Sequence, residues 1–91
     1  MHNKKYRLQN LETKRKHPMY DEILGKICYL VYFKEGERGW FLCDTGEPIK
    51  PVHRIHTSKV KDVEYTRGGQ IIVYTENTKY VFEVILDGQE N

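Results

Sequence analysis

The sequence has few of the features that mark small secreted, membrane or metal-stabilised proteins. It contains two cysteines and three prolines, and its longest uncharged apolar run is the seven residues from Ile27 to Phe33. Two cysteines cannot build the disulfide framework of a small secreted domain, and seven residues are far fewer than the about 20 that cross a bilayer as a helix. No apolar segment follows the basic N-terminal residues, so we expect no secretory signal, no membrane contact and a cytoplasmic protein.

The 91 residues are enough for one domain with a thin core. The formal net charge is only +2, but it is unevenly spread. Residues 1–17 carry six basic side chains and one acidic side chain, a net charge of +5, whereas residues 18–91 carry nine basic and twelve acidic side chains, a net charge of −3. A basic terminal segment joined to a mildly acidic body is typical of proteins that contact an anionic partner, although the same side chains also keep a terminal segment solvated.

Turn-forming residues divide the chain into short segments with the composition of β-strands. Pro18 and Gly25 bracket one expected helical turn at 19–24, and the pair Gly68-Gly69 predicts a hairpin. The expected strands cover 26–33, which we expect to be a central strand covered on both faces, then 40–43, an irregular 52–65 with a kink at Ser58-Lys59, 70–75 and 78–85.

Five or six short strands with little helix predict an all-β protein, a small antiparallel barrel that is SH3-like or, as the second choice, OB-like. We therefore expect a basic arm at 1–17, which is able to supply a first strand, a barrel domain at 18–86 and a polar tail at 87–91. Tyr80, Phe82 and Val84 alternate onto one face of the last strand and should contribute to the core.

No pattern of residues points to catalysis or to a cofactor. Cys28, Cys43, His53 and His56 include the right atoms for zinc, but fourteen residues separate the two cysteines and only the histidines are close. Structural zinc sites usually take their ligands in close pairs, so we expect no metal, buried free thiols and no enzymatic activity.

Binding has more support from composition, because 12% of the residues are aromatic. Tyrosine, tryptophan and arginine anchor protein interfaces, and small barrels also bind nucleic acid by combining a basic groove with aromatic rings. Trp40, beside a turn, is the best candidate for an exposed ring, and the final hairpin offers an edge for self-association. The candidate partner-binding residues are Arg7, Lys14, Arg15, Lys16, Arg38, Trp40 and Arg54.

One sequence pattern suggests a biological setting for the protein. Residues 57–60 read T-S-x-V, and residues 73–82 read V-x-T-x-N-T-x-Y-x-F. Together with Gly25-Lys26 and the stretch 36–41, this pattern resembles small uncharacterised accessory proteins of Gram-positive bacteria, their phages and mobile elements. The resemblance implies a binding role, such as that of an anti-CRISPR-type inhibitor, but it supplies no functional residues.

Taken together, the sequence predicts a non-enzymatic accessory or inhibitory protein that acts by protein–protein contact. Its partner would be a protein, with a host nucleoprotein complex such as a defence nuclease as the example that the resemblance suggests. The alternative is a small barrel that binds nucleic acid through its basic arm and exposed aromatic rings.

Overall fold

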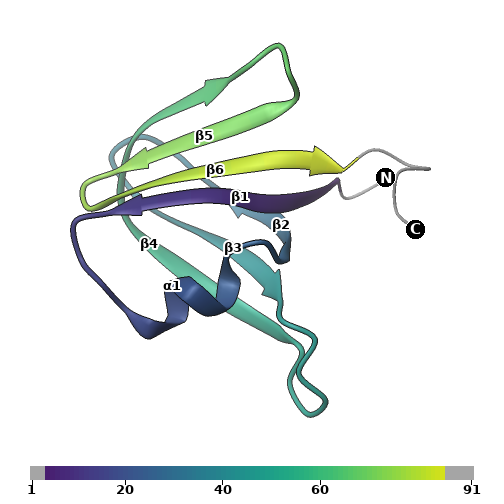
Figure 1. Ribbon diagram of the computed structural model, residues 1–91. Helices are drawn as coiled ribbons and strands as arrows, with labels where there is room; N and C mark the ends of the chain where they lie inside the picture. Colours follow the sequence, from purple (N-terminus) through teal and green to yellow (C-terminus); the bar gives the residue numbers. More distant parts are fainter. Residues whose placement is uncertain (1–3, 86–91) are drawn as a thin grey trace.

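Alternating apolar side chains and well-placed turn residues give this chain six strands and one short helix. The computed structural model describes residues 4–85 (Figure 1). The strands join edge to edge, all antiparallel, in the order β1-β2-β3-β4-β5-β6, and β6 pairs back onto β1 to close a barrel. The elements are β1 (Lys5–Thr13), α1 (Pro18–Ile23), β2 (Ile27–Tyr32), β3 (Arg38–Asp44), β4 (Val52–Tyr65), β5 (Gln70–Thr75) and β6 (Thr78–Ile85).

The predicted all-β antiparallel barrel with one short helical turn is therefore confirmed. The polar tail predicted at 87–91 lies outside the described residues.

Most of the stretch predicted as a basic arm is the first strand of the barrel. Tyr6 and Leu8 of β1 are buried, whereas the residues between and beside them are exposed. Along its whole length β1 pairs with β6, from Lys5 opposite Ile85 to Thr13 opposite Thr78. The basic side chains of β1 therefore occupy the outer positions of a two-faced strand, and the first strand of the barrel, Lys5–Thr13, comes from within residues 1–17.

The helix α1 lies where the prolines and glycines predict it. Pro18 is its first residue, and the Nδ1 atom of His17 accepts a hydrogen bond from the Met19 backbone N–H at 3.1 Å. Ile23 is 1% exposed and packs into the barrel core. Gly25 then adopts φ 83° and donates its N–H to the Leu8 carbonyl at 2.8 Å. In the part of the chain from residue 4 to residue 85, no helix has the length and apolar character needed to span a membrane.

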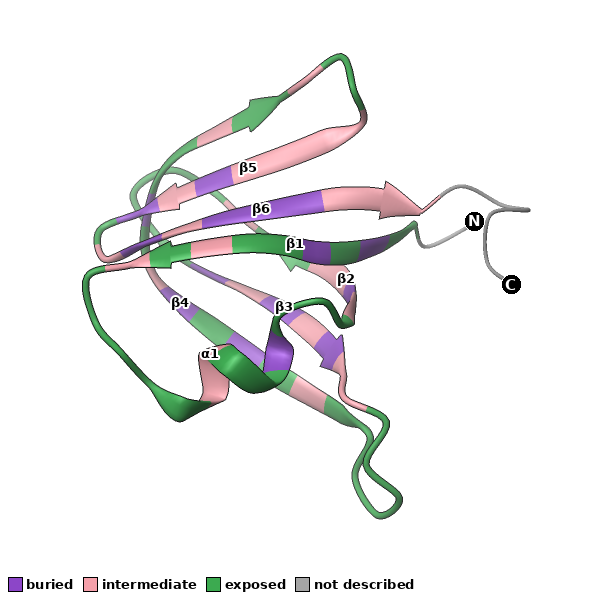
Figure 2. Cartoon of the chain, in the orientation of Figure 1, coloured by how far each residue is buried: buried purple, intermediate pink, exposed green. Residues whose placement is uncertain are grey.

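The core forms from the inward positions of every strand (Figure 2). Phe41 and Phe82 meet edge to face with their ring centres 5.1 Å apart, and Tyr80 meets Phe41 in the same way at 5.6 Å. Cys28 and Cys43 lie directly opposite each other on β2 and β3, and both are buried and free, as predicted. The Cys43 side chain, as a hydrogen-bond partner, and burial both raise the pKa of the Cys28 thiol.

The prediction for the strand at 26–33 was wrong in one respect. The inner face of β2 is covered, but Val31 is 46% exposed and Tyr32 is 39% exposed. The register between β2 and β3 shifts between Leu30 and Tyr32, which is the signature of a β-bulge. A bulge changes which side chains point outward, so a run of apolar residues does not here mean a strand covered on both faces.

The strand β4 pairs with two neighbouring strands. Its first half pairs with β3 and its second half with β5, with register shifts at Arg38/Trp40 on β3 and at Val60/Asp62 on β4. At the bend, the buried Thr57 hydroxyl accepts the Gly39 N–H at 3.0 Å and donates to the Ser58 carbonyl at 2.7 Å. The predicted kink at Ser58-Lys59 thus coincides with the bend at which β4 passes from one neighbour to the other.

The turn between β5 and β6 is fixed onto the same bend. The Asn77 N–H donates to the Ser58 hydroxyl at 3.2 Å, and the Glu76 N–H donates to the Lys59 carbonyl at 3.0 Å. Within the turn, the Thr75 hydroxyl donates to the Thr78 carbonyl at 2.8 Å and accepts the Thr78 N–H at 3.1 Å. The two halves of the T-S and T-x-N-T pattern are therefore held together by hydrogen bonds, and most of these residues have a structural role.

We expect Thr57→Val to destabilise the barrel by about 1–3 kcal/mol, because it leaves the buried Gly39 N–H without an acceptor while keeping the shape of the side chain. The measurement is urea unfolding followed by tryptophan fluorescence. The control is Thr57→Ser, which keeps the hydroxyl and removes one methyl group. An equal loss of stability in both variants would show that packing, and not the hydrogen bond, is what Thr57 contributes.

Candidate partner-binding surfaces

The seven predicted partner-binding residues fall in three places. Arg7 is on the outer face of β1, opposite Glu83 of β6. Lys14, Arg15 and Lys16 are exposed in the segment between β1 and α1. Arg38, Trp40 and Arg54 lie on the neighbouring strands β3 and β4. The structure brings Arg15 near the third group and leaves Arg7 away from it.

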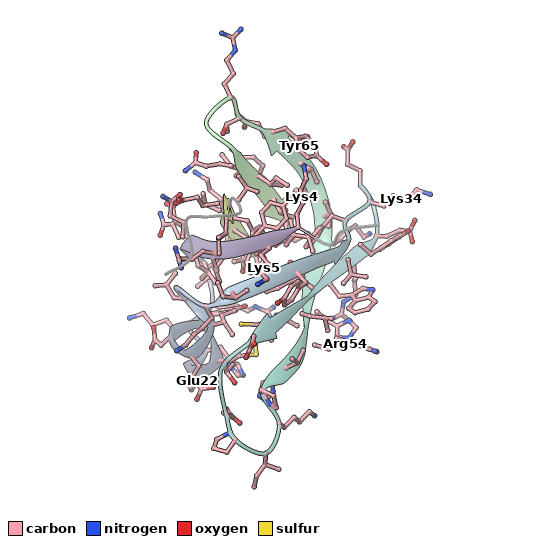
Figure 3. All side chains as sticks on the ribbon, turned by 90° about the vertical axis from the view of Figure 1, so that its right-hand side faces the viewer. Lys4, Lys5, Glu22, Lys34, Arg54 and Tyr65 are labelled. Atoms are coloured by element: carbon pink, nitrogen blue, oxygen red, sulfur yellow. The ribbon has the colours of Figure 1, made fainter. Side chains whose placement is uncertain are left out.

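Trp40 is covered by side chains of β4. The Arg54 guanidinium carbon lies 4.6 Å from the centre of the indole ring, and His56, opposite Trp40 in register, stacks on it with ring centres 6.2 Å apart. Trp40 is consequently half-buried and is not the free stacking surface that its place beside a turn suggested. Figure 3 shows Arg54 on the outside of the barrel wall.

Arg38, His56 and Arg15 line one groove, which we call the basic groove. It has a volume of about 410 Å³ and lies beside the turn between β5 and β6. Its lining comes from separate segments of the chain and includes Tyr20 of α1. The charged and ionisable residues in this lining are Arg15, Arg38, His56, Lys59 and Glu76. His56 was weighed from the sequence only as a zinc ligand, and neither His56 nor Lys59 was among the predicted partner-binding residues.

A second and larger groove lies at the end of the barrel where β1 and β5 begin and β2 and β4 end. We call it the tyrosine groove because Tyr6, Tyr29, Tyr32 and Tyr65 line it. Its volume is about 710 Å³, and the other lining residues are Lys4, Leu30, Val31, Phe33, Leu42, Val63 and Ile71. Figure 3 shows Lys4 and Tyr65 close together at this end.

The tyrosine groove borders the end of β2 beyond its pairing with β1. Among residues 4–85, the register between the two strands joins Tyr6 to Cys28 and Arg7 to Ile27. From Tyr29 to Tyr32, the ladder partners found within residues 4–85 come from β3. Sequence reasoning missed this site, because Tyr32 and Tyr65 are 33 positions apart and meet only through the closure of the barrel.

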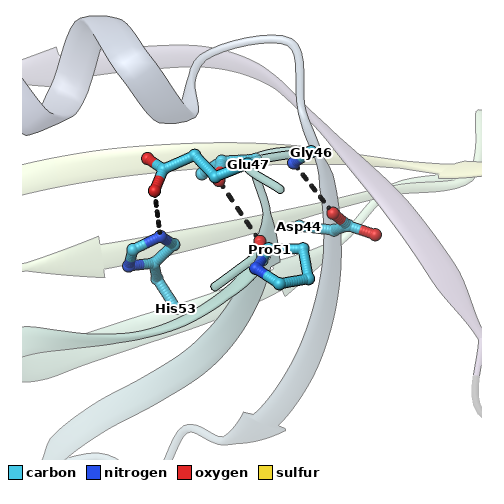
Figure 4. Close-up of polar contacts among 6 residues, drawn as sticks. Asp44, Gly46, Glu47, Pro51 and His53 are labelled. Atoms are coloured by element: carbon cyan, nitrogen blue, oxygen red, sulfur yellow. Dashed lines mark hydrogen bonds and ion pairs between the residues drawn. The ribbon is translucent and has the colours of Figure 1, made fainter. Parts of the chain in front are cut away.

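The candidate zinc ligands do not converge. Cys28, Cys43 and His53 lie in one row across β2, β3 and β4, whereas His56 is on the outer face against Trp40. His53 instead meets Glu47, with Nε2 and Oε2 3.5 Å apart, in the loop that joins β3 to β4 (Figure 4). In the described part of the chain, no three histidine, cysteine or acidic side chains are placed to hold a metal ion.

The loop around Glu47 is held by its own polar contacts. The Gly46 N–H donates to the Asp44 carboxylate at 3.0 Å, and the Thr45 hydroxyl donates to the Pro51 carbonyl at 3.2 Å (Figure 4). Gly46 has φ 79°, which favours glycine at this turn. These contacts give Asp44 and Glu47 local structural partners.

Comparison with protein-family models, with curated proteins and with solved structures finds no match for this chain.

Tyr80, which lines the basic groove, gives a pH-dependent prediction. Burial, with a smaller contribution from Tyr20, raises the pKa of Tyr80 above its ordinary value of 10.0. The folded protein therefore holds this proton more tightly than the unfolded chain does. The contribution to stability is complete below pH 10 and is lost as the pH rises above that value.

We expect Tyr80→Phe to flatten the fall in the free energy of unfolding above about pH 10. The measurement is urea unfolding at a series of pH values. Tyr29→Phe is the control, since Tyr29 is only half-buried on the outer face of β2. A wild-type pH dependence in Tyr80→Phe would show that other groups cause the alkaline loss of stability.

Proposed function

We propose that this protein is a non-enzymatic binding protein whose tyrosine groove takes an extended segment of a partner protein. The observation that carries the proposal is the segment of β2 from Tyr29 to Tyr32, which lies beyond the β1–β2 pairs found within residues 4–85 and borders the groove. An extended peptide can add to such an edge through main-chain hydrogen bonds, while side-chain pockets select its sequence.

The exposed fractions of the side chains around this edge favour a protein ligand. Tyr65 is 75% exposed, and Val31 and Tyr32 are also exposed. Tyrosine combines a large apolar ring with a polar hydroxyl and is enriched among the residues that dominate binding energy. A partner that covers these side chains would remove apolar area from water at three neighbouring positions.

The charge of the groove restricts which partner segments would fit it. Lys4 is the one charged side chain that lines it among the described residues. A strand that fills the groove would therefore carry apolar or aromatic side chains toward Leu30 and Ile71 and one acidic side chain toward Lys4. The resemblance adds the setting to this proposal: an accessory or inhibitory protein, with a defence nuclease or another host nucleoprotein complex as its target.

The experiment is a selection from a library of displayed peptides about ten residues long, enough for one strand. We expect an enriched pattern of alternating apolar residues with one acidic residue. The selected peptide is then titrated into ¹⁵N-labelled protein, and amide shifts should concentrate at Leu30–Tyr32 and around Tyr65.

Val31→Asp should weaken binding of the selected peptide about tenfold or more, because it places a charge on the apolar wall of the groove. The matched control is Ile49→Asp, which makes the same kind of change at a side chain that is 97% exposed in the β3–β4 loop. Tyr65→Ala, at an exposed position, serves as a second groove variant should Val31→Asp reduce stability.

Two results would overturn the proposal. One is a library with no enriched sequence, or a peptide whose shifts map away from the groove. The other is concentration-dependent dimerisation in sedimentation experiments that Val31→Asp abolishes, because the groove would then take a second copy of this chain.

A further inference from the structure

The basic groove is distinct from the tyrosine groove and shares no lining residue with it. It lies where the turn between β5 and β6 crosses the bend of β4. Arg15 reaches it from the segment after β1, Arg38 from the start of β3, and Lys59 from β4. Three cations from separate parts of the chain thus face one hollow.

These cations have no acidic partners. Within residues 4–85, Lys34 pairs with Glu37 and Lys79 with Glu12, whereas Arg15, Arg38 and Lys59 form no salt bridge. Glu76 is the one acidic residue that lines the groove, so three cations and one anion give it a charge of +2 with His56 neutral. Closely spaced cations repel one another, and an anionic ligand would relieve that repulsion.

The groove is also held in place. Arg38 donates from Nε to the Thr57 carbonyl at 3.1 Å, which fixes the guanidinium and leaves the donors on its two terminal nitrogens for a ligand. The Ser58 hydroxyl accepts the Asn77 N–H at 3.2 Å and keeps its own proton to donate. A positioned arginine beside a free hydroxyl donor suits a phosphate oxygen.

The positive surface continues past the turn. A second hollow of about 410 Å³ shares Glu76, Asn77 and Thr78 with the basic groove. Besides Glu76, its charged lining is Lys14, Lys61 and the ion pair of Lys79 with Glu12, which leaves three cations and two anions. The Lys14 N–H donates to the Asn77 carbonyl at 2.9 Å, so the backbone of the basic segment is attached to the turn. The two hollows adjoin at the turn and make a track with cations on both sides of it, which suits a ligand with repeated negative charges.

Aromatic rings border the same track. Tyr20 lines the basic groove, and His56, which also lines it, stacks on Trp40 beneath Arg54. Single-stranded nucleic acids are bound by a positive groove along the backbone with aromatic side chains next to the bases. We infer that the basic groove and the adjoining hollow bind the phosphodiester backbone of a single-stranded nucleic acid.

The test uses a fluorescein-labelled oligothymidylate of about 15 nucleotides, within the range that small barrels cover. Fluorescence anisotropy is measured over a series of salt concentrations. The logarithm of the association constant should fall linearly with the logarithm of the salt concentration. Arg15→Gln and Arg38→Gln should each reduce the steepness of that line by about 0.7, the value for one phosphate contact with a single strand.

Matched variants separate the site from net charge. Arg67→Gln removes one positive charge from an exposed residue of the β4–β5 turn and should bind nearly as well as the wild type. Glu76→Gln removes the one acidic lining residue and should tighten binding about two- to fivefold. Arg15→Gln is the decisive loss variant, because the Arg15 side chain makes no hydrogen bond in residues 4–85 whose loss could unfold the protein.

Several outcomes would overturn the inference. These are no binding at about 100 mM salt, equal losses in Arg67→Gln and Arg15→Gln, or weaker binding in Glu76→Gln. Equal competition by polyglutamate would assign the groove to an acidic protein, and preference for a duplex of the same length would contradict the single-stranded ligand. A labelled oligoribonucleotide distinguishes RNA from DNA as the source of the backbone.

The two sites can fail independently. Val31→Asp should leave oligonucleotide binding unchanged, and Arg15→Gln should leave binding of the selected peptide unchanged. Loss of both activities in either variant would indicate one shared surface, which contradicts the inference of a separate nucleic-acid site.

Discussion

The fourteen-residue strand β4 pairs with β3 along its first half and with β5 along its second half, and the register shifts where it changes neighbour. Such a bend interrupts the ladder and leaves backbone groups to be satisfied elsewhere. In β4 the Thr57 hydroxyl and the turn between β5 and β6 supply those partners. The closed barrel depends on this arrangement, because β4 is the strand that links β3 to β5. The basic groove lies directly against this bend. Beyond the bend, the later half of β4 carries Tyr65 to the tyrosine groove.

Closure with such short strands is uneven around the barrel. Within residues 4–85, β1 pairs with β6 over its whole length but with β2 at two positions. Aromatic and aliphatic side chains at one end of the barrel line the tyrosine groove. A binding site of this kind does not need added loops, because its lining comes from the strands themselves and from the residues directly beside them.

The parts of the fold that could be predicted from the sequence are those that depend on neighbouring residues. Pro18 and Gly25 bracket α1, Gly68-Gly69 forms a turn, and Tyr80 and Phe82 alternate into the core. The exposure of Val31 and Tyr32 was not predicted, because it depends on a register shift against β3. Such a shift leaves no local signal in an apolar run.

The candidate sites were predictable to a similar extent. Arg38, Trp40 and Arg54 were each named from the sequence as candidates, but the contact of Arg54 and His56 with Trp40 depends on cross-strand register. The meeting of Arg15 with Arg38 depends on a turn some 40 residues further along the chain than Arg38. Contacts between residues so far apart in the sequence are set by the topology of the barrel. The sequence pattern predicted the fold class but not that topology.

The pairing of the first strand with the last has a consequence for synthesis of the protein. Every residue of β1 from Lys5 to Leu8 finds its β6 partner more than 70 positions later in the chain. Contacts of such long sequence separation make folding slow compared with that of helical proteins of the same size. On the ribosome, the hairpins β2–β3 and β5 with the end of β4 can form as they emerge, but β1 keeps an open edge until β6 has been translated. During that interval the nascent chain is most exposed to mispairing, and the outward side chains of Lys5 and Arg7 in β1 discourage it.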